Sequence, residues 1–124
     1  MQVPILKQGR FLIATVQAAL NDEGLKHLQA DLLEKVGSFR SQGVIVDVTT
    51  LDVIDSFATR TLRSIAETTK LRGAEVVIVG IQPDVAFAMV QLGLTLHGAQ
   101  TALDLDVGLE ILDQMITERD IHAF

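Results

Sequence analysis

Ser56 is the residue of this sequence whose type and position best suit regulatory chemistry. It follows Asp55 where a short apolar run, Val44–Val48, passes through a loop into an amphipathic helix. The first turn of a helix leaves backbone N–H groups without intrahelical partners, and the helix dipole makes that end partly positive, which favours a bound phosphate. Ser56 is therefore interpreted as a helix cap, as a phosphoacceptor, or as a cap that becomes a phosphoacceptor.

The side chains beside Ser56 form a candidate partner-binding surface. Phe57 fits either an interface anchor or the core, because large aromatic side chains serve in both. Thr59 lies about one helical turn after Ser56 and is the second candidate acceptor. The partner-binding candidates are Asp55, Phe57, Thr59 and Arg60. Where they have no such role, the polar residues of the next turns are expected at solvated helix positions: Thr59, Arg60, Thr61 and Arg63.

Asp47 is the rival phosphoacceptor. An aspartate at the end of a central parallel strand holds the phosphoryl group in response-regulator receivers, but those domains also need an acidic pair after their first strand. This chain has Leu6-Lys7 and Thr15-Val16 at the ends of its first two strands. We therefore predict a structural role for Asp47, in which its carboxylate accepts hydrogen bonds from loop amides.

Other catalytic constellations are missing from the sequence. The chain has no cysteine, which excludes disulfides, thiolate metal sites and cysteine nucleophiles. His27, His97 and His122 lie far apart, without the spacing of metal-binding helices, and are expected on a solvent face, in a loop and in the C-terminal tail. The sequence also lacks a Gly-x-Ser-x-Gly elbow and a P-loop. We expect no enzyme activity, no metal and no cofactor.

The composition favours an assembly subunit. Hydrophobic residues make up 48% of the 124 residues and the mean hydropathy is +0.37, yet no apolar run is long enough to cross a bilayer. The surplus is expected in subunit contacts. A net charge of −6 and no basic cluster with aromatic neighbours argue against nucleic acid. Without a signal-peptide pattern, the expected location is cytoplasmic, with no membrane association.

Hydrophobic periodicity predicts strands and helices in alternation after an initial hairpin. Strands are expected at residues 3–6 and 11–16 around a Gly-containing turn at 7–10, then at 44–48, at 75–79 and, more weakly, at 100–103. The first helix begins at Asn21 or Asp22 and ends before Gly43, with an apolar face made of Leu25, Leu28, Leu32, Val36 and Phe39.

Three further helices are predicted. One begins at Asp55-Ser56 and ends at Gly73, with an apolar face of Ala58, Leu62, Ile65, Ala66 and Thr69. The next runs from Pro83 to Gly93, and the last carries Leu105, Leu109, Leu112 and Ile116 before fraying from Glu118.

These elements indicate an α/β fold, a mixed and mostly parallel sheet of about four to five strands packed with about four α-helices. We expect a single domain over residues 1–124, with its core at about 3–118 and a short C-terminal tail.

Three segments resemble the STAS domain, the fold of anti-sigma-factor antagonists: Val46-Asp-Val48, Asp55-Ser56 and Ala74–Gly80. The resemblance covers essentially residues 3–118. In that family an Asp-Ser or Asp-Thr pair after the third strand carries the regulatory phosphoacceptor at the start of the second helix. The resemblance therefore implies that Ser56 is phosphorylated.

Two departures from the usual antagonist pattern resemble the stressosome branch of the family. Phe57-Ala58 follows Ser56 in place of a small residue, and Gly80-Ile-Gln-Pro83 follows the later strand. RsbR-type subunits of that branch carry an added N-terminal sensory domain, and this chain is expected to lack one. It is therefore most similar to the scaffold subunits of the RsbS type.

That similarity implies a set of partners. Scaffold subunits of this type co-assemble with RsbR-type STAS paralogues into a large shell and sequester an RsbT-type serine/threonine kinase. Phosphorylation of Ser56 would release the kinase, and an RsbX-type phosphatase would reverse it. Two alternatives remain open: a free-standing antagonist that binds an anti-sigma kinase without a shell, and a ligand-binding α/β domain.

Overall fold

A five-stranded sheet forms the centre of the computed structural model, which describes residues 3–17 and 21–121. The strands follow one another across the sheet in chain order: β1 (Ile5–Gln8), β2 (Phe11–Thr15), β3 (Gly43–Asp47), β4 (Glu75–Val79) and β5 (Gln100–Ala102). β1 pairs antiparallel with β2, and the remaining neighbours are parallel. The predicted mixed, mostly parallel α/β sheet is confirmed.

The N-terminal hairpin is tighter than the sequence indicated. β1 continues through Lys7 and Gln8, and Gln8 pairs with Phe11, so the turn consists of two residues. Gly9 adopts a φ of 59°, a left-handed conformation that suits glycine in a short hairpin turn. The predicted turn at 7–10 was therefore too long by two residues.

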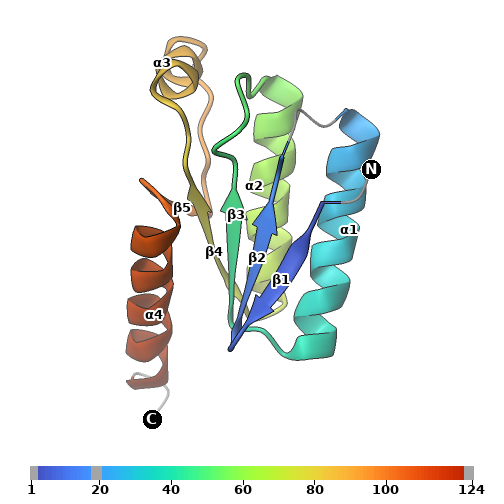
Figure 1. Cartoon of the computed structure of the whole chain (residues 1–124), viewed down its shortest axis with the longest axis vertical. Coiled ribbons are helices and arrows are strands. Elements are labelled where there is room, and N and C mark those ends of the chain that lie inside the picture. The colour runs from blue at the N-terminus through green and yellow to red at the C-terminus, as the bar shows by residue number, and fades with distance from the viewer. Residues whose placement is uncertain (1–2, 18–20, 122–124) are drawn as a thin grey trace.

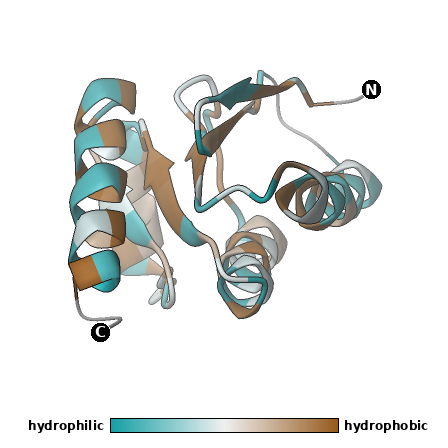
Figure 2. Cartoon of the chain, turned by 90° about the horizontal axis from the view of Figure 1, so that it is seen from below, coloured by the Kyte–Doolittle hydropathy of each residue, from teal (hydrophilic) through white to brown (hydrophobic). Residues whose placement is uncertain are grey.

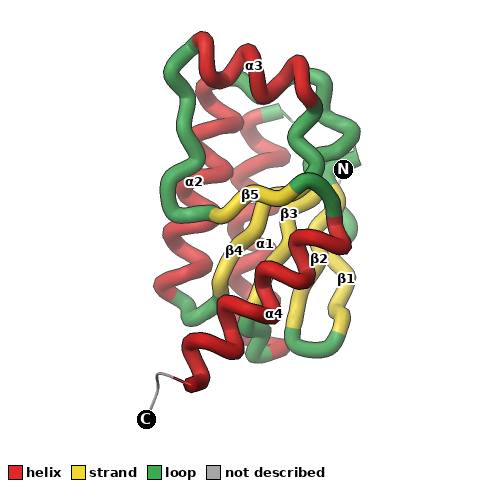
Figure 3. The backbone as a smooth tube through the Cα atoms, turned by 90° about the vertical axis from the view of Figure 1, so that its left-hand side faces the viewer, coloured by secondary structure: helices red, strands yellow, loops and turns green. Residues whose placement is uncertain are grey.

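Helices cover both faces of the sheet (Figure 1). α1 (Asp22–Phe39) and α2 (Ser56–Leu71) pack side by side on one face, and α4 (Leu105–Ile121) lies on the other. Figure 2 shows the hydrophobic strands between these two layers. The short helix α3 (Pro83–Gln91) lies at the end of the sheet where β3 and β4 finish, as Figure 3 also shows.

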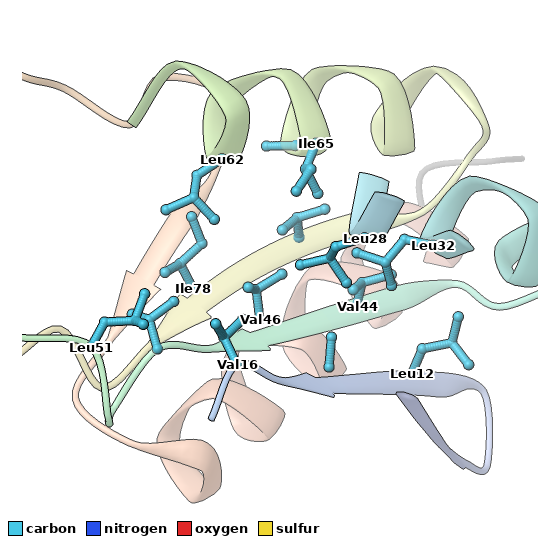
Figure 4. Close-up of a cluster of buried hydrophobic side chains, with 14 of the residues drawn as sticks. Leu12, Val16, Leu28, Leu32, Val44, Val46, Leu51, Leu62, Ile65 and Ile78 are labelled. Carbon is cyan, nitrogen blue, oxygen red and sulfur yellow. The ribbon is translucent and has the colours of Figure 1, made fainter. Parts of the chain in front are cut away.

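The main core lies between the sheet and the α1–α2 layer. Figure 4 shows β-branched side chains of the central strands, such as Val46 and Ile78, facing Leu28, Leu62 and Ile65 from the two helices. β3 and β4 are buried on both faces, which explains their continuous apolar sequence. α2, which begins at Ser56, is thus packed against the sheet along its buried side.

The second, smaller core lies beneath α4. Leu112 and Ile116 are fully buried, and a Cβ added at Gly108 would lie 2.6 Å from a Val79 methyl carbon. The fraying predicted from Glu118 onwards is wrong for residues 118–121, because α4 remains helical to Ile121; residues 122–124 lie outside the described residues. The Arg119 guanidinium donates a hydrogen bond to the carbonyl of Gly73 at 3.0 Å, which holds the last turn of α4 against the rest of the domain.

Phe39 was wrongly assigned to the buried face of the first helix. It is 45% exposed, while the four predicted leucine and valine positions before it are buried. α1 ends at Phe39, and Arg40 then takes a left-handed conformation with a φ of 50° that turns the chain towards β3. The Phe39 ring instead lies 5.7 Å from the ammonium group of Lys7 in β1.

Candidate functional site

The loop from β3 to α2 begins at Asp47 and is fixed by that side chain. The carboxylate of Asp47 accepts hydrogen bonds from the backbone N–H of Thr49 at 2.9 Å and from its hydroxyl at 2.5 Å. This local pattern stabilises the turn that leaves the sheet. The structural role predicted for Asp47 is therefore confirmed.

Hydrogen bonds to two other parts of the chain, together with burial in the main core, hold the middle of this loop. The Thr50 hydroxyl donates to the Val16 carbonyl at 2.7 Å, and the Gln82 amide donates to the Thr49 carbonyl at 2.7 Å. Leu51 and Ile54 are each only 5% exposed and join the main core. The approach to Ser56 is thus anchored by backbone, side-chain and apolar contacts.

Asp55, and not Ser56, caps α2. Asp55 has an extended backbone, and its carboxylate accepts a hydrogen bond from the Ala58 N–H at 2.8 Å, the geometry of an N-cap. Ser56 is the first helical residue, and its side chain is exposed. The interpretation of Ser56 as the cap is therefore wrong, and its hydroxyl is left available for other chemistry.

Removing the cap should destabilise the helix that carries Ser56. We expect Asp55→Ala to lower the free energy of unfolding by about 1 kcal/mol, because the Ala58 N–H would lose its acceptor. Asp55→Asn is the matched control, since its amide oxygen can still accept that bond, and its stability should stay within about 0.5 kcal/mol of the wild type. Urea unfolding measures both; equal losses for Ala and Asn would contradict the cap.

The other candidates beside Ser56 have unequal access. Arg60 is exposed one turn after Ser56, and Phe57 is half-buried, with the Lys26 ammonium group 6.0 Å from its ring centroid. Thr59 and Thr61 were expected at solvated positions, but they are only 1% and 7% exposed. Their burial follows from their packing beside the apolar face of α2.

Thr59 therefore differs from Ser56 as a candidate acceptor. Its hydroxyl has no hydrogen-bond partner among the described residues and lies below the protein surface. A kinase could reach it only after α2 had moved. The spacing of Thr59 from Leu62 and Ala66, by three and seven residues, was the sequence signal for this burial. Its modification remains a prediction, on weaker grounds than that of Ser56.

The structure shows where two of the three histidines lie. His27 is exposed on α1 and His97 is exposed in a loop, as predicted, whereas His122 lies outside the described residues. Within residues 3–17 and 21–121, no group of three acidic or histidine side chains could hold a metal ion. No helix in the same part of the chain is long and apolar enough to span a bilayer.

A shallow groove of about 180 Å³ adjoins the site, and sequence analysis did not identify it. It lies between the loop residues 52–55 and one side of α3. Val53, Ala88 and Leu92 line its open side, whereas Ile54 and Val85 are buried beneath it. We call this feature the α3 groove. No sequence signal marked it, because it arises where two segments distant in sequence meet.

Comparison with known proteins places this geometry in a family. Residues 2–105 match the STAS domain family model. RsbRA of Bacillus subtilis, named as an RsbT co-antagonist protein, is 31% identical over 102 residues, which cover 82% of this chain. The match spans only 37% of RsbRA, so the likeness concerns about a third of that relative.

Solved structures of similar length match almost completely. A serine-to-glutamate variant of RsbS from Moorella thermoacetica has a TM-score of 0.80 and 32% identity, over 94% of this chain and 99% of that one. A chain from a structure of the stressosome, described as a signal integration and transduction hub, has a TM-score of 0.73 and 31% identity, over 91% and 98% of the two chains. The fold is thus shared over nearly the whole length of these chains.

Proposed function

The chain belongs to the STAS domain family, and on that premise we propose that it is a non-catalytic scaffold and regulatory subunit of a bacterial stressosome. The observation that carries the proposal is the match to the RsbS variant over nearly the full length of both chains. The match to a stressosome chain at 31% identity supports it further. The sequence features, including the surplus of apolar residues, agree with a subunit that buries surface against neighbours.

The proposed partners in the assembly are RsbR-type STAS paralogues. RsbRA shares 31% identity with this chain over the STAS region, so the two folds can present related surfaces. Several large apolar side chains are exposed on this chain, among them Leu6, Phe87 and Leu103. Exposed apolar side chains of this size can be buried against neighbouring subunits in an assembly.

The second part of the proposal is that the chain sequesters an RsbT-type serine/threonine kinase and releases it when Ser56 is phosphorylated. Ser56 is exposed at the first position of α2, and Asp55 already caps the helix, so its hydroxyl can enter an active site without unfolding the helix. An RsbX-type phosphatase would restore the unmodified chain.

Phosphorylation of Ser56 should change binding more than it changes the fold. A phosphoserine carries about −1.5 to −2 charges and strong acceptor oxygens. The phosphate oxygens can accept hydrogen bonds from free N–H groups of the first turn, which stabilises the helix start. A kinase, however, presents nucleotide phosphates and a catalytic carboxylate to its acceptor hydroxyl. The new charge beside Asp55 would repel these groups, and its bulk would separate the surfaces.

Assembly size separates the scaffold from the alternatives. Light scattering coupled to size-exclusion chromatography should show a large mixed particle when the chain is combined with an RsbR-type paralogue, and the kinase should co-elute with it. Kinase binding by a monomer or dimer with no mixed particle would favour the free antagonist. Failure to bind either protein, together with a bound metabolite in native mass spectrometry, would favour the ligand-binding domain.

A further inference from the structure

The α3 groove is an apolar surface next to the proposed phosphorylation site. Its open side is formed by Val53, which is 67% exposed, by Leu92, which is 69% exposed, and by the exposed Ala88. Asp55, the cap of α2, lines the same groove and is the direct neighbour of Ser56. A protein that contacts Ser56 can therefore reach this groove as well.

The charge around the groove has one sign. Asp52, Asp55 and Asp84 line it, and no lysine or arginine does. Within the described part of the chain, none of these three carboxylates takes part in an ion pair. An occupant with an acidic surface would be repelled by these carboxylates. A segment with a lysine or arginine beside an apolar side chain would complement both the three aspartates at the rim of the groove and its apolar residues.

We infer that the α3 groove is the docking site of the sequestered kinase, occupied by a kinase segment that carries an apolar anchor next to a lysine or arginine. This inference rests on the proposed function and adds the chemistry of the partner. The apolar anchor covers Val53 and Leu92, and the cation lies among the three carboxylates. Such a pair of contacts is typical of an interface centre with a charged rim.

The groove and Ser56 then have separate tasks. The basic segment holds the kinase at the α3 groove, while the anionic nucleotide in its active site faces the Ser56 hydroxyl. Phosphate on Ser56 acts at the second contact, where it meets the kinase's own negative groups. The groove therefore provides affinity that does not depend on the acceptor hydroxyl, and its loss should weaken binding even when Ser56 is intact.

Ala88→Lys tests the docking site, and Ala86→Lys is its matched control. Both alanines are exposed on α3, but they lie two residues apart and face different sides of the helix, and only Ala88 lines the groove. A lysine at position 88 fills the groove and brings its own cation to the rim. We expect Ala88→Lys to weaken kinase binding by about tenfold or more, and Ala86→Lys to change it by less than about twofold.

Isothermal titration of both variants of the 124-residue chain with the RsbT-type kinase of the same organism measures this difference, and thermal unfolding verifies that both variants fold. A second measurement uses Asp84→Asn, which should weaken binding and make it less sensitive to added salt, because one rim charge is gone.

Each outcome decides between the possibilities. Equal binding of the kinase by wild type, Ala88→Lys and Asp84→Asn would overturn the docking site and leave the proposed function intact. No kinase binding by the wild-type chain would overturn the proposed function and this inference with it. If Ala88→Lys instead prevents self-association or assembly with the RsbR-type paralogue while kinase binding persists, the groove is a subunit contact and the inference is wrong.

Discussion

Replacing Ser56 with aspartate is expected to weaken binding of the RsbT-type kinase by about tenfold or more, equivalent to about 1.4 kcal/mol. The new carboxylate would lie beside Asp55 at the exposed first position of α2, facing the anionic groups of the kinase active site. The fold should be retained, because a negative charge is favourable in the first turn of a helix. Titration calorimetry with the isolated kinase measures the loss.

Two further substitutions at position 56 distinguish the effect of the negative charge from the effects of side-chain volume and of losing the acceptor hydroxyl. Ser56→Asn adds nearly the same volume as aspartate without the charge, so it should retain most of the kinase affinity. Ser56→Ala removes the acceptor hydroxyl, so the complex should form and persist in the presence of ATP. Equal affinity of the kinase for the Asp and Ala variants would refute the proposed switch, and equal losses for Asp and Asn would make it purely steric.

Gly80→Ala should destabilise the whole site. Gly80 has a φ of 82°, and a Cβ there would overlap the Thr49 hydroxyl and lie 3.1 Å from the Thr49 Cα. Because the obstacle includes backbone, a side-chain rotation cannot relieve it. The left-handed conformation and the overlap together should lower the free energy of unfolding by about 2–5 kcal/mol. Displacing Thr49 would also disturb its bonds to Asp47 and Gln82.

Gly73→Ala is the matched control for this effect. Gly73 has a similar φ of 93°, but a Cβ there meets no atom within 4 Å. Its loss should be limited to backbone strain, about 1–2 kcal/mol, with kinase affinity unchanged. Chemical denaturation of both variants, followed by kinase titration, separates the effect of backbone strain from the effect of the overlap with Thr49. Similar stability losses for the two alanines would show that the Thr49 contact has no effect.

Sequence patterns predicted the central layers because their physical signals are strong. The segments that form β3 and β4 are apolar at nearly every position. This pattern is typical of a strand that is buried on both faces, and both strands are buried as expected. Leu25, Leu28 and Leu32 likewise marked the buried side of α1. In these segments local periodicity and tertiary packing demand the same residues.

Predictions failed where the ends of elements depend on contacts distant in sequence. The exposure of Phe39 depends on where the chain turns after α1, and the helicity after Glu118 is supported by Arg119 reaching Gly73. Neither contact has a local sequence signal. A strong periodic pattern therefore located each helix, while its last turn was decided by the tertiary structure.

The candidate site was predicted in position but not in detail. The pair Asp55-Ser56 indicated a helix start, but aspartate and serine both cap helices well, so the sequence did not distinguish which of the two is the cap. The structure assigns that role to Asp55 and leaves Ser56 exposed. The α3 groove could not be predicted, because its lining comes from two segments separated by α2 and β4.

Phosphosite mapping by mass spectrometry would show whether Ser56 is the regulatory phosphoacceptor. The chain would be isolated from its own cells before and after stress, and its phosphopeptides quantified. We predict that the phosphate on Ser56 rises with stress, because this side chain is exposed and a different residue, Asp55, caps the helix. Ser56 that stays unmodified while stress releases the kinase, or phosphate confined to other residues, would contradict it.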